Sequence, residues 1–161
     1  MIRLRVVALD LPRPVLERCV DNNVREALSG GFFSKPEFEP LGDLYLDGDR
    51  RPSRPFRAPW SAVRGSIHNH DGRIDISARP ELPARQDGDL LQAGPHLVRG
   101  GAAAVADGDD REGFSAIQEE FYSDITDGPQ PRTALAITPS LRRRCALRLG
   151  QGVGRLAALI P

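Results

Sequence analysis

The sequence predicts an α+β fold, with a mostly antiparallel, twisted sheet of short strands and one or two helices near the N-terminus. Two observations lead to this class. Short apolar runs recur along most of the chain, and the dipeptides Asp47-Gly48 and Asp71-Gly72 favour hairpins between them. Helical spacing of apolar residues stands out in one stretch, residues 15–28. Strands joined by tight turns pair antiparallel, so this pairing should dominate the sheet.

Composition and charge limit the classes of partner. The chain has 161 residues, of which 40% are hydrophobic and 27% charged, and it carries no net charge. It contains no apolar run long enough to cross a membrane. Residues 141–161 are basic, but basic residues without interleaved aromatics are weak evidence for nucleic-acid binding. We therefore expect neither nucleic acid nor a membrane as partner, and the sequence leaves the oligomeric state open.

The start of the chain and its cysteines predict a cytoplasmic location. Residues 2–6 alternate between apolar and basic side chains, which is typical of a strand and not of a secretory signal. Cys19 and Cys145 lie far apart and form neither a disulfide framework nor a zinc motif. Free thiols fit a reducing compartment.

The remaining elements follow from short apolar runs and turn residues. Residues 50–59 are expected to be an extended surface loop, residues 106–113 a solvated acidic loop, and residues 141–161, which show no strand alternation, a poorly ordered tail. The expected strands after the first are 44–46, 60–67, 73–77, an interrupted stretch within 87–101, 102–105 and 131–138.

Two histidines precede the second hairpin turn. His68 and His70 would face the same side of a strand, and imidazoles at this spacing can ligate a metal. The sequence does not indicate a third ligand. Two solvent-facing histidines at a hairpin end are therefore the preferred interpretation, and we predict no metal and no other cofactor.

Three segments combine residue types that suit an anionic sugar ligand. Gly30 and Gly31 allow close approach of a ligand, or they end a helix. Gln92-Ala-Gly-Pro-His96 interrupts an apolar strand, either as a bend beside a ligand or as a plain turn between two strands. Arg132 stands at a strand mouth, where its planar fork can clamp a phosphate or simply face solvent.

These segments resemble, in the same order, three motifs of the phosphodiester glycosidase domain family. Residues 29–33 (S-G-G-F-F) resemble N-G-G-F-F, residues 92–98 (Q-A-G-P-H-L-V) resemble Q-A-G-P-x-L-V, and residues 132–136 (R-T-A-L-A) resemble R-T-A-x-G. Ser29 stands in place of asparagine and Ala136 in place of glycine. The resemblance implies a mixed, mostly antiparallel sheet, with residues 1–140 forming a partial domain.

Family members continue after the third motif to an N-L-D-G-G-G-S-like segment, which this sequence lacks. We accordingly expect residues 141–161 to be a basic, aberrant end on a C-terminally truncated domain. The resemblance implies hydrolysis of a sugar–phosphate diester or related glycan, impaired by this truncation. The alternatives are a non-catalytic module that binds a glycan or sugar phosphate, and a non-functional fragment.

The resemblance also implies roles for particular residues. Arg132 would clamp the phosphate, and Asp124 is the candidate catalytic carboxylate. His96 would polarise an oxygen or pack. The expected substrate-binding residues are Ser29, Gly30, Gly31, Phe32, Gln92, Gly94, Pro95 and Thr133.

Overall fold

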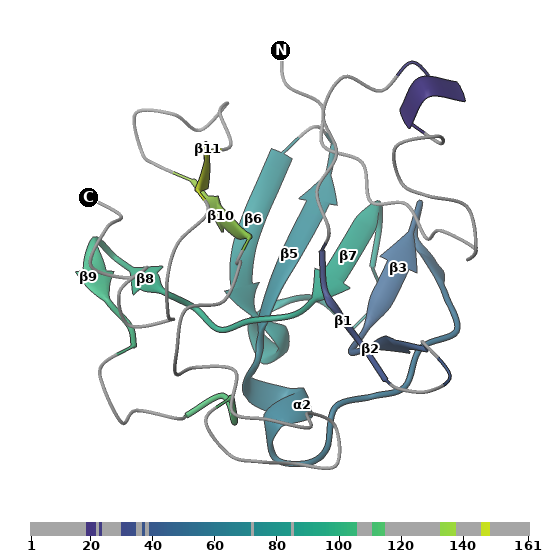
Figure 1. Ribbon diagram of the computed structural model, residues 1–161. Coiled ribbons are helices and arrows are strands. Elements are labelled where there is room, and N and C mark those ends of the chain that lie inside the picture. The colour runs from purple at the N-terminus through teal and green to yellow at the C-terminus, as the bar shows by residue number, and fades with distance from the viewer. Residues whose placement is uncertain are drawn as a thin grey trace.

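The computed structural model describes residues 19–21, 23, 30–34, 37, 39–71, 73–84, 86–105, 111–114, 133–137 and 146–148. Within these ranges short strands dominate, accompanied by brief helical turns, so the predicted α+β class is confirmed (Figure 1). The predicted strand 2–6 and most of the predicted helix 15–28 lie outside the described residues. Residues 19–21 are helical, as the apolar spacing predicts.

A five-stranded antiparallel sheet forms the centre of the fold (Figure 1). Its spatial order is β4-β3-β7-β5-β6, so β7 inserts between two hairpins that precede it in the sequence. The strands are β3 (Leu44–Leu46), β4 (Asp49–Arg50), β5 (Gly65–His70), β6 (Arg73–Ala78) and β7 (Asp89–Gln92). The predicted strands at 44–46 and 73–77 are therefore confirmed.

Both predicted hairpin turns are present. Asp47 and Gly48 have φ values of 53° and 84°, the left-handed conformations that a tight two-residue turn requires, and Leu46 pairs with Asp49 across the turn. Asp71, with φ 46°, begins the turn that joins β5 to β6, where His70 pairs with Arg73. Local turn chemistry thus sets the register of these two hairpins.

Three two-stranded sheets complete the described strands. They pair β1 (Phe32–Phe33) with β2 (Pro40–Leu41), β8 (Val98–Arg99) with β9 (Ala102–Ala103), and β10 (Ala134–Ala136) with β11 (Ala146–Arg148). All strand pairs are antiparallel, and one isolated parallel bridge joins Leu41 to Arg54. The predicted strand 102–105 is confirmed at its first two residues, and the predicted strand 131–138 is confirmed in its central residues. The expectation of a tail without strands is wrong for residues 146–148, which form β11. Pairing with β10 can stabilise a strand in a segment that has no apolar periodicity of its own.

The region before β5 departs from the sequence prediction. Residues 60–67 were expected to be one strand, but α2 (Trp60–Val63) is a single helical turn and the strand begins only at Gly65. Within the predicted surface loop 50–59, Phe56 is buried and packs with Leu41, Phe114 and Phe32. A short 3-10 helix, η1 (Arg79–Glu81), follows β6. Among the described residues, no helix is long and apolar enough to cross a membrane.

Candidate functional site

Two of the three motif segments lie against each other. A Cβ atom added to Gly30 or Gly31 would lie 3.0 or 3.1 Å from a methyl carbon of Leu91. The backbone of this glycine pair therefore rests on β7, one residue before Gln92. Larger residues would push Leu91 away, so the glycines allow a close approach of two chain segments that are distant in the sequence.

Aromatic contacts extend this junction. The Phe32 ring lies 5.5 Å from the Phe114 ring and 6.3 Å from the Phe56 ring, measured between centroids. Phe114 in turn reaches the backbone of Gly94, since a Cβ atom there would lie 3.4 Å from its ring. Phe32, predicted to contact substrate, is therefore part of the core that supports the 92–96 segment.

Gln92 is buried, and both polar atoms of its side-chain amide form hydrogen bonds with the backbone. Its Nε2 donates to the carbonyl of Ser61 (2.7 Å), and its Oε1 accepts from the N–H of Asp43 (3.2 Å). Its exposed fraction is 2%. The side chain thus ties β7 to α2 and to the segment before β3, so its observed contacts are structural.

Gly94 and Pro95 form the bend that the sequence indicates. Gly94 has φ 75°, and a Cβ atom at this position would overlap the Oε2 atom of Glu112. Glycine is needed here both for the backbone conformation and for the space. The strand ends at Gln92 and a separate short strand, β8, begins at Val98, so the bend separates strands of different sheets.

Glu112 is the side chain that fills this space, and sequence reasoning missed it. Its Oε2 accepts from the N–H of Gly65 (2.8 Å), and its Oε1 accepts from the N–H of His96 (2.8 Å). Its carboxylate also lies 3.4 Å from Nδ1 of His96. The prediction of a solvated acidic loop is wrong for Glu112. No local pattern distinguishes it from the neighbouring acids.

The hydrogen bonds keep Glu112 ionised despite its burial. Burial by itself would raise the pKa of this carboxyl group. The hydrogen bonds from the His96 side chain and from the backbone N–H groups of His96 and Gly65 outweigh burial, and the pKa lies below the usual 4.5. The site therefore holds a carboxylate that accepts three bonds.

His96 is buried between Glu112 and β5. Its Nδ1–H points to the Glu112 carboxylate, and a Cβ atom on Gly65 would lie 2.9 Å from the same nitrogen. The Nε2 atom is shielded from solvent and has no hydrogen-bond partner among the described residues. In the neutral ring this nitrogen carries a lone pair, so His96 can accept a proton from a group that reaches it.

Arg64 binds the backbone of the segment that carries Glu112 and is fully buried, with an exposed fraction of 0%. Its Nε donates to the carbonyl of Glu112 (2.8 Å), and its Nη2 donates to the carbonyl of Gly113 (3.0 Å). The guanidinium carbon lies 3.9 Å from the Phe56 ring centroid and 4.3 Å from that of Phe114. Arg64 therefore fixes the backbone that carries Glu112.

The third motif segment is described only in part. Ser29, Asp124 and Arg132 lie outside the described residues. Thr133 is exposed and directly precedes β10, which pairs with β11. The structure thus brings together the first two motif segments.

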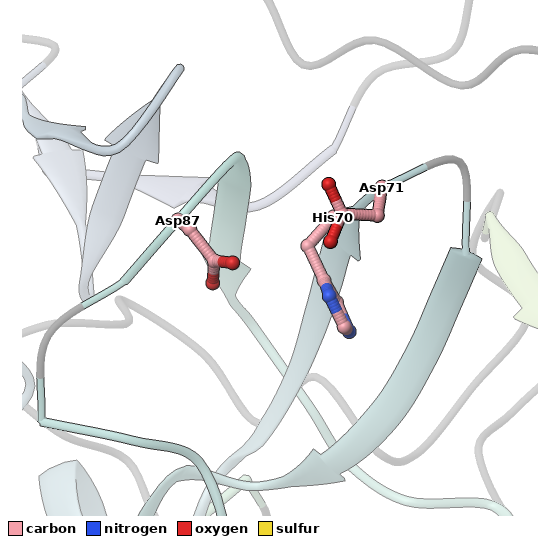
Figure 2. Close-up of side chains that lie close together, drawn as sticks. All are labelled: His70, Asp71 and Asp87. Atoms are coloured by element: carbon pink, nitrogen blue, oxygen red, sulfur yellow. The ribbon is translucent and has the colours of Figure 1, made fainter.

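A second cluster of chemically active side chains lies at the far end of β5 (Figure 2). His70, Asp71 and Asp87 each place one possible metal-ligand atom within 4.8 Å of the others. The Nε2–H of His68 donates to the carbonyl of Asp87 (2.7 Å), and the rings of His68 and His70 stack 4.4 Å apart. The prediction of two solvent-facing histidines is wrong for His68, which is 3% exposed.

Comparison of the chain with protein-family models, curated proteins and solved structures found no match.

Proposed function

We propose that this chain is a phosphodiester glycosidase-like hydrolase that cleaves the glycosidic bond of a sugar–phosphate diester or a related glycan. One observation carries the proposal. The segments around Gly31 and Gly94 resemble two separate motifs of that family, are distant in the sequence, and meet at Leu91 and Phe114. A shared substrate gives a reason for both motifs to lie at one place.

The chemistry of the substrate determines what the protein must supply. A phosphate leaves as a stable anion, so this reaction depends less on a proton donor than ordinary glycoside hydrolysis does. It depends more on groups that stabilise the phosphate. In this proposal Arg132 clamps the phosphate with two hydrogen bonds, and backbone N–H groups of Gly30, Gly31 and Gly94 approach the anion or sugar. Asp124 is the reacting carboxylate.

The described residues add a proton acceptor to this scheme. His96 belongs to the same segment as Gly94, and Glu112 holds its Nδ1 side. The lone pair at Nε2 suits a general base that takes a proton from the attacking water. Because Nε2 is shielded from solvent, the segment must open for water to reach it.

The proposed partner is a sugar-phosphate ligand, with neither nucleic acid nor a membrane involved. A cytoplasmic setting belongs to the same proposal and rests on the low cysteine content of the sequence.

Turnover tests the proposal directly. The full chain is incubated with a panel of glycosyl phosphodiesters, and the phosphomonoester product is followed by phosphorus NMR. Product should appear with the native chain and be lost in Arg132→Ala. The matched control is Arg99→Ala, which removes a half-exposed arginine paired with Glu81 and should keep activity. If the native chain binds a diester but releases no product, the proposed hydrolase activity is contradicted.

A non-catalytic module that binds a sugar phosphate is the second candidate, and Glu112 favours it. This carboxylate binds the 92–96 segment, and bonds from Gly65 and His96 already engage both of its oxygens. Both polar atoms of the buried Gln92 amide are likewise bonded to the protein backbone. A module of this kind would raise its melting temperature with ligand and leave the diester intact.

A further inference from the structure

The end of β5 that carries His70 is remote from the proposed sugar-phosphate site. Gly65 and His70 stand at opposite ends of the strand, which corresponds to roughly 16 Å at the usual rise per residue. The register of β5 against β7 agrees with this separation, because Ser66 pairs with Gln92 near one end of β5 and Asn69 pairs with Asp89 near the other. A ligand at His70 is therefore independent of one at Gly94.

We propose that His70, Asp71 and Asp87 form a binding site for a divalent transition-metal ion of the zinc type. One imidazole and two carboxylates are a ligand set for such an ion, and three protein ligands leave one position for water. Figure 2 shows the Asp87 side chain reaching from the segment before β7 toward the His70 ring, with Asp71 beside it at the end of β5. The bound ion links the β5–β6 hairpin to the segment before β7.

The ring of His70 is already oriented for this task. Its Nε2–H donates to the Asp75 carboxylate at 3.1 Å, which leaves the lone pair of the neutral ring on Nδ1. A carboxylate on the remote nitrogen is the usual partner of a metal-bound histidine, because it fixes the tautomer and raises the basicity of the ligand. The stack on buried His68 holds the plane of the ring.

The backbone before β7 is also held in place. His68 binds the Asp87 carbonyl, and the next residue, Gly88, lies so close to β5 that a Cβ atom on it would overlap the Asn69 carbonyl. The Gly88 carbonyl accepts from Gly48 at 2.7 Å. The main chain of Asp87 is therefore fixed, while its carboxylate is 72% exposed and can turn.

The spacing of the ligand atoms fits an ion after small side-chain rotations. Metal–ligand distances near 2.1 Å place tetrahedral ligands about 3.4 Å apart. The atoms here lie within 4.8 Å of one another, so the carboxylates have to approach the ring by about an ångström. Asp71 and Asp87 are both exposed, which permits this movement.

Calorimetric titration of the full, chelator-treated chain with zinc chloride tests the site. One saturable site per chain is expected. His70→Gln and Asp87→Asn should each weaken zinc binding more than about 100-fold, and Asp75→Asn, which alters only the orienting partner, by roughly 10- to 100-fold. The charge-matched control Glu37→Gln removes an exposed acid between β1 and β2 and should bind as the native chain does.

Other outcomes overturn the proposal. The proposal is wrong if zinc shows no saturable binding. It is also wrong if the native chain, His70→Gln and Asp87→Asn bind zinc equally, because the ion would then lie elsewhere, for instance on the cysteines. Equal affinity for calcium would contradict a site with a nitrogen ligand. The thermal unfolding of each variant in the presence of chelator should match the native chain, which separates loss of a ligand from loss of the fold.

Discussion

The Oε2 atom of Glu112 lies 2.8 Å from the backbone nitrogen of Gly65, and this hydrogen bond joins the segment 111–114 to the first residue of β5. The other oxygen of the same carboxylate binds the backbone of His96. One side chain thus connects three segments around Gly94.

Replacement of Glu112 by glutamine should destabilise the fold. An amide has one acceptor oxygen, so its NH₂ group would face either the N–H of Gly65 or that of His96 and leave that donor unsatisfied. We expect a loss of about 1–3 kcal/mol in the free energy of unfolding. Urea denaturation measures it, and Glu37→Gln is the exposed control. Equal stability of the two variants would contradict the role of Glu112.

The stability of the native chain should depend on pH through the same group. The folded-state pKa of Glu112 lies below its usual 4.5, because the hydrogen bonds from His96 and Gly65 outweigh burial. A depressed carboxyl pKa contributes stability that is complete above the unfolded-state pKa and is lost as the pH falls through the folded-state pKa. The stability difference between the native chain and Glu112→Gln should therefore be constant near neutral pH and shrink below 4.5. Urea denaturation across this range checks it. A gap that widens in acid would refute the assignment.

Comparison of Gly94→Ala with Gly100→Ala separates the cost of steric overlap from the cost of a strained backbone conformation. An alanine at position 94 would be strained at φ 75° and would also overlap Glu112. Gly100→Ala is the matched control, since Gly100 has φ 59° and a Cβ atom there meets nothing within 4 Å. We expect a loss of about 1–2 kcal/mol for Gly100→Ala, from conformation alone, and a clearly larger one for Gly94→Ala. Equal losses in thermal or urea unfolding would argue against the close contact with Glu112.

Arg64→Lys should be costly although it keeps the charge. Lysine has no planar fork to bind the carbonyls of Glu112 and Gly113 together, nor a flat group to stack on Phe56. The expected loss is about 1.5–3 kcal/mol, the contribution of one hydrogen bond to a charged group. Arg99→Lys, at a half-exposed ion pair, should change stability by less than about 0.5 kcal/mol. Similar effects of both substitutions would exclude a supporting role for Arg64.

Local chemistry explains which elements are predictable from the sequence. The hairpin at Asp47-Gly48 needs only two residues in left-handed conformations, so the dipeptide is sufficient evidence for it. The boundary at Arg64 is different. Residues 60–67 contain apolar residues that suit either a strand or a helix. The break follows from burial of Arg64 against Phe56 and against Phe114, and Phe114 is distant in the sequence.

The same distinction holds for the candidate sites. Motif residues such as Gly94 are visible in the sequence because glycine and proline interrupt an apolar run. Glu112 is not visible, because the two residues that its carboxylate binds, Gly65 and His96, come from other segments. The cluster at His70 required the pairing of β5 with β7, which places Asp87 beside the histidines. Glu112 and Asp87 are therefore identified only by their neighbours in the folded chain, which no local sequence pattern shows.

Binding of a non-hydrolysable glycosyl phosphonate, followed through backbone amide shifts in NMR, tests the central claim most directly. The claim is that the segments around Gly31 and Gly94 form one sugar-phosphate site. We expect saturable shifts at Gly30, Gly31, Gly94 and His96, with Gly100 and Gly101 in the β8–β9 turn unchanged. Shifts confined to other parts of the chain, or no saturable shift at all, would contradict it.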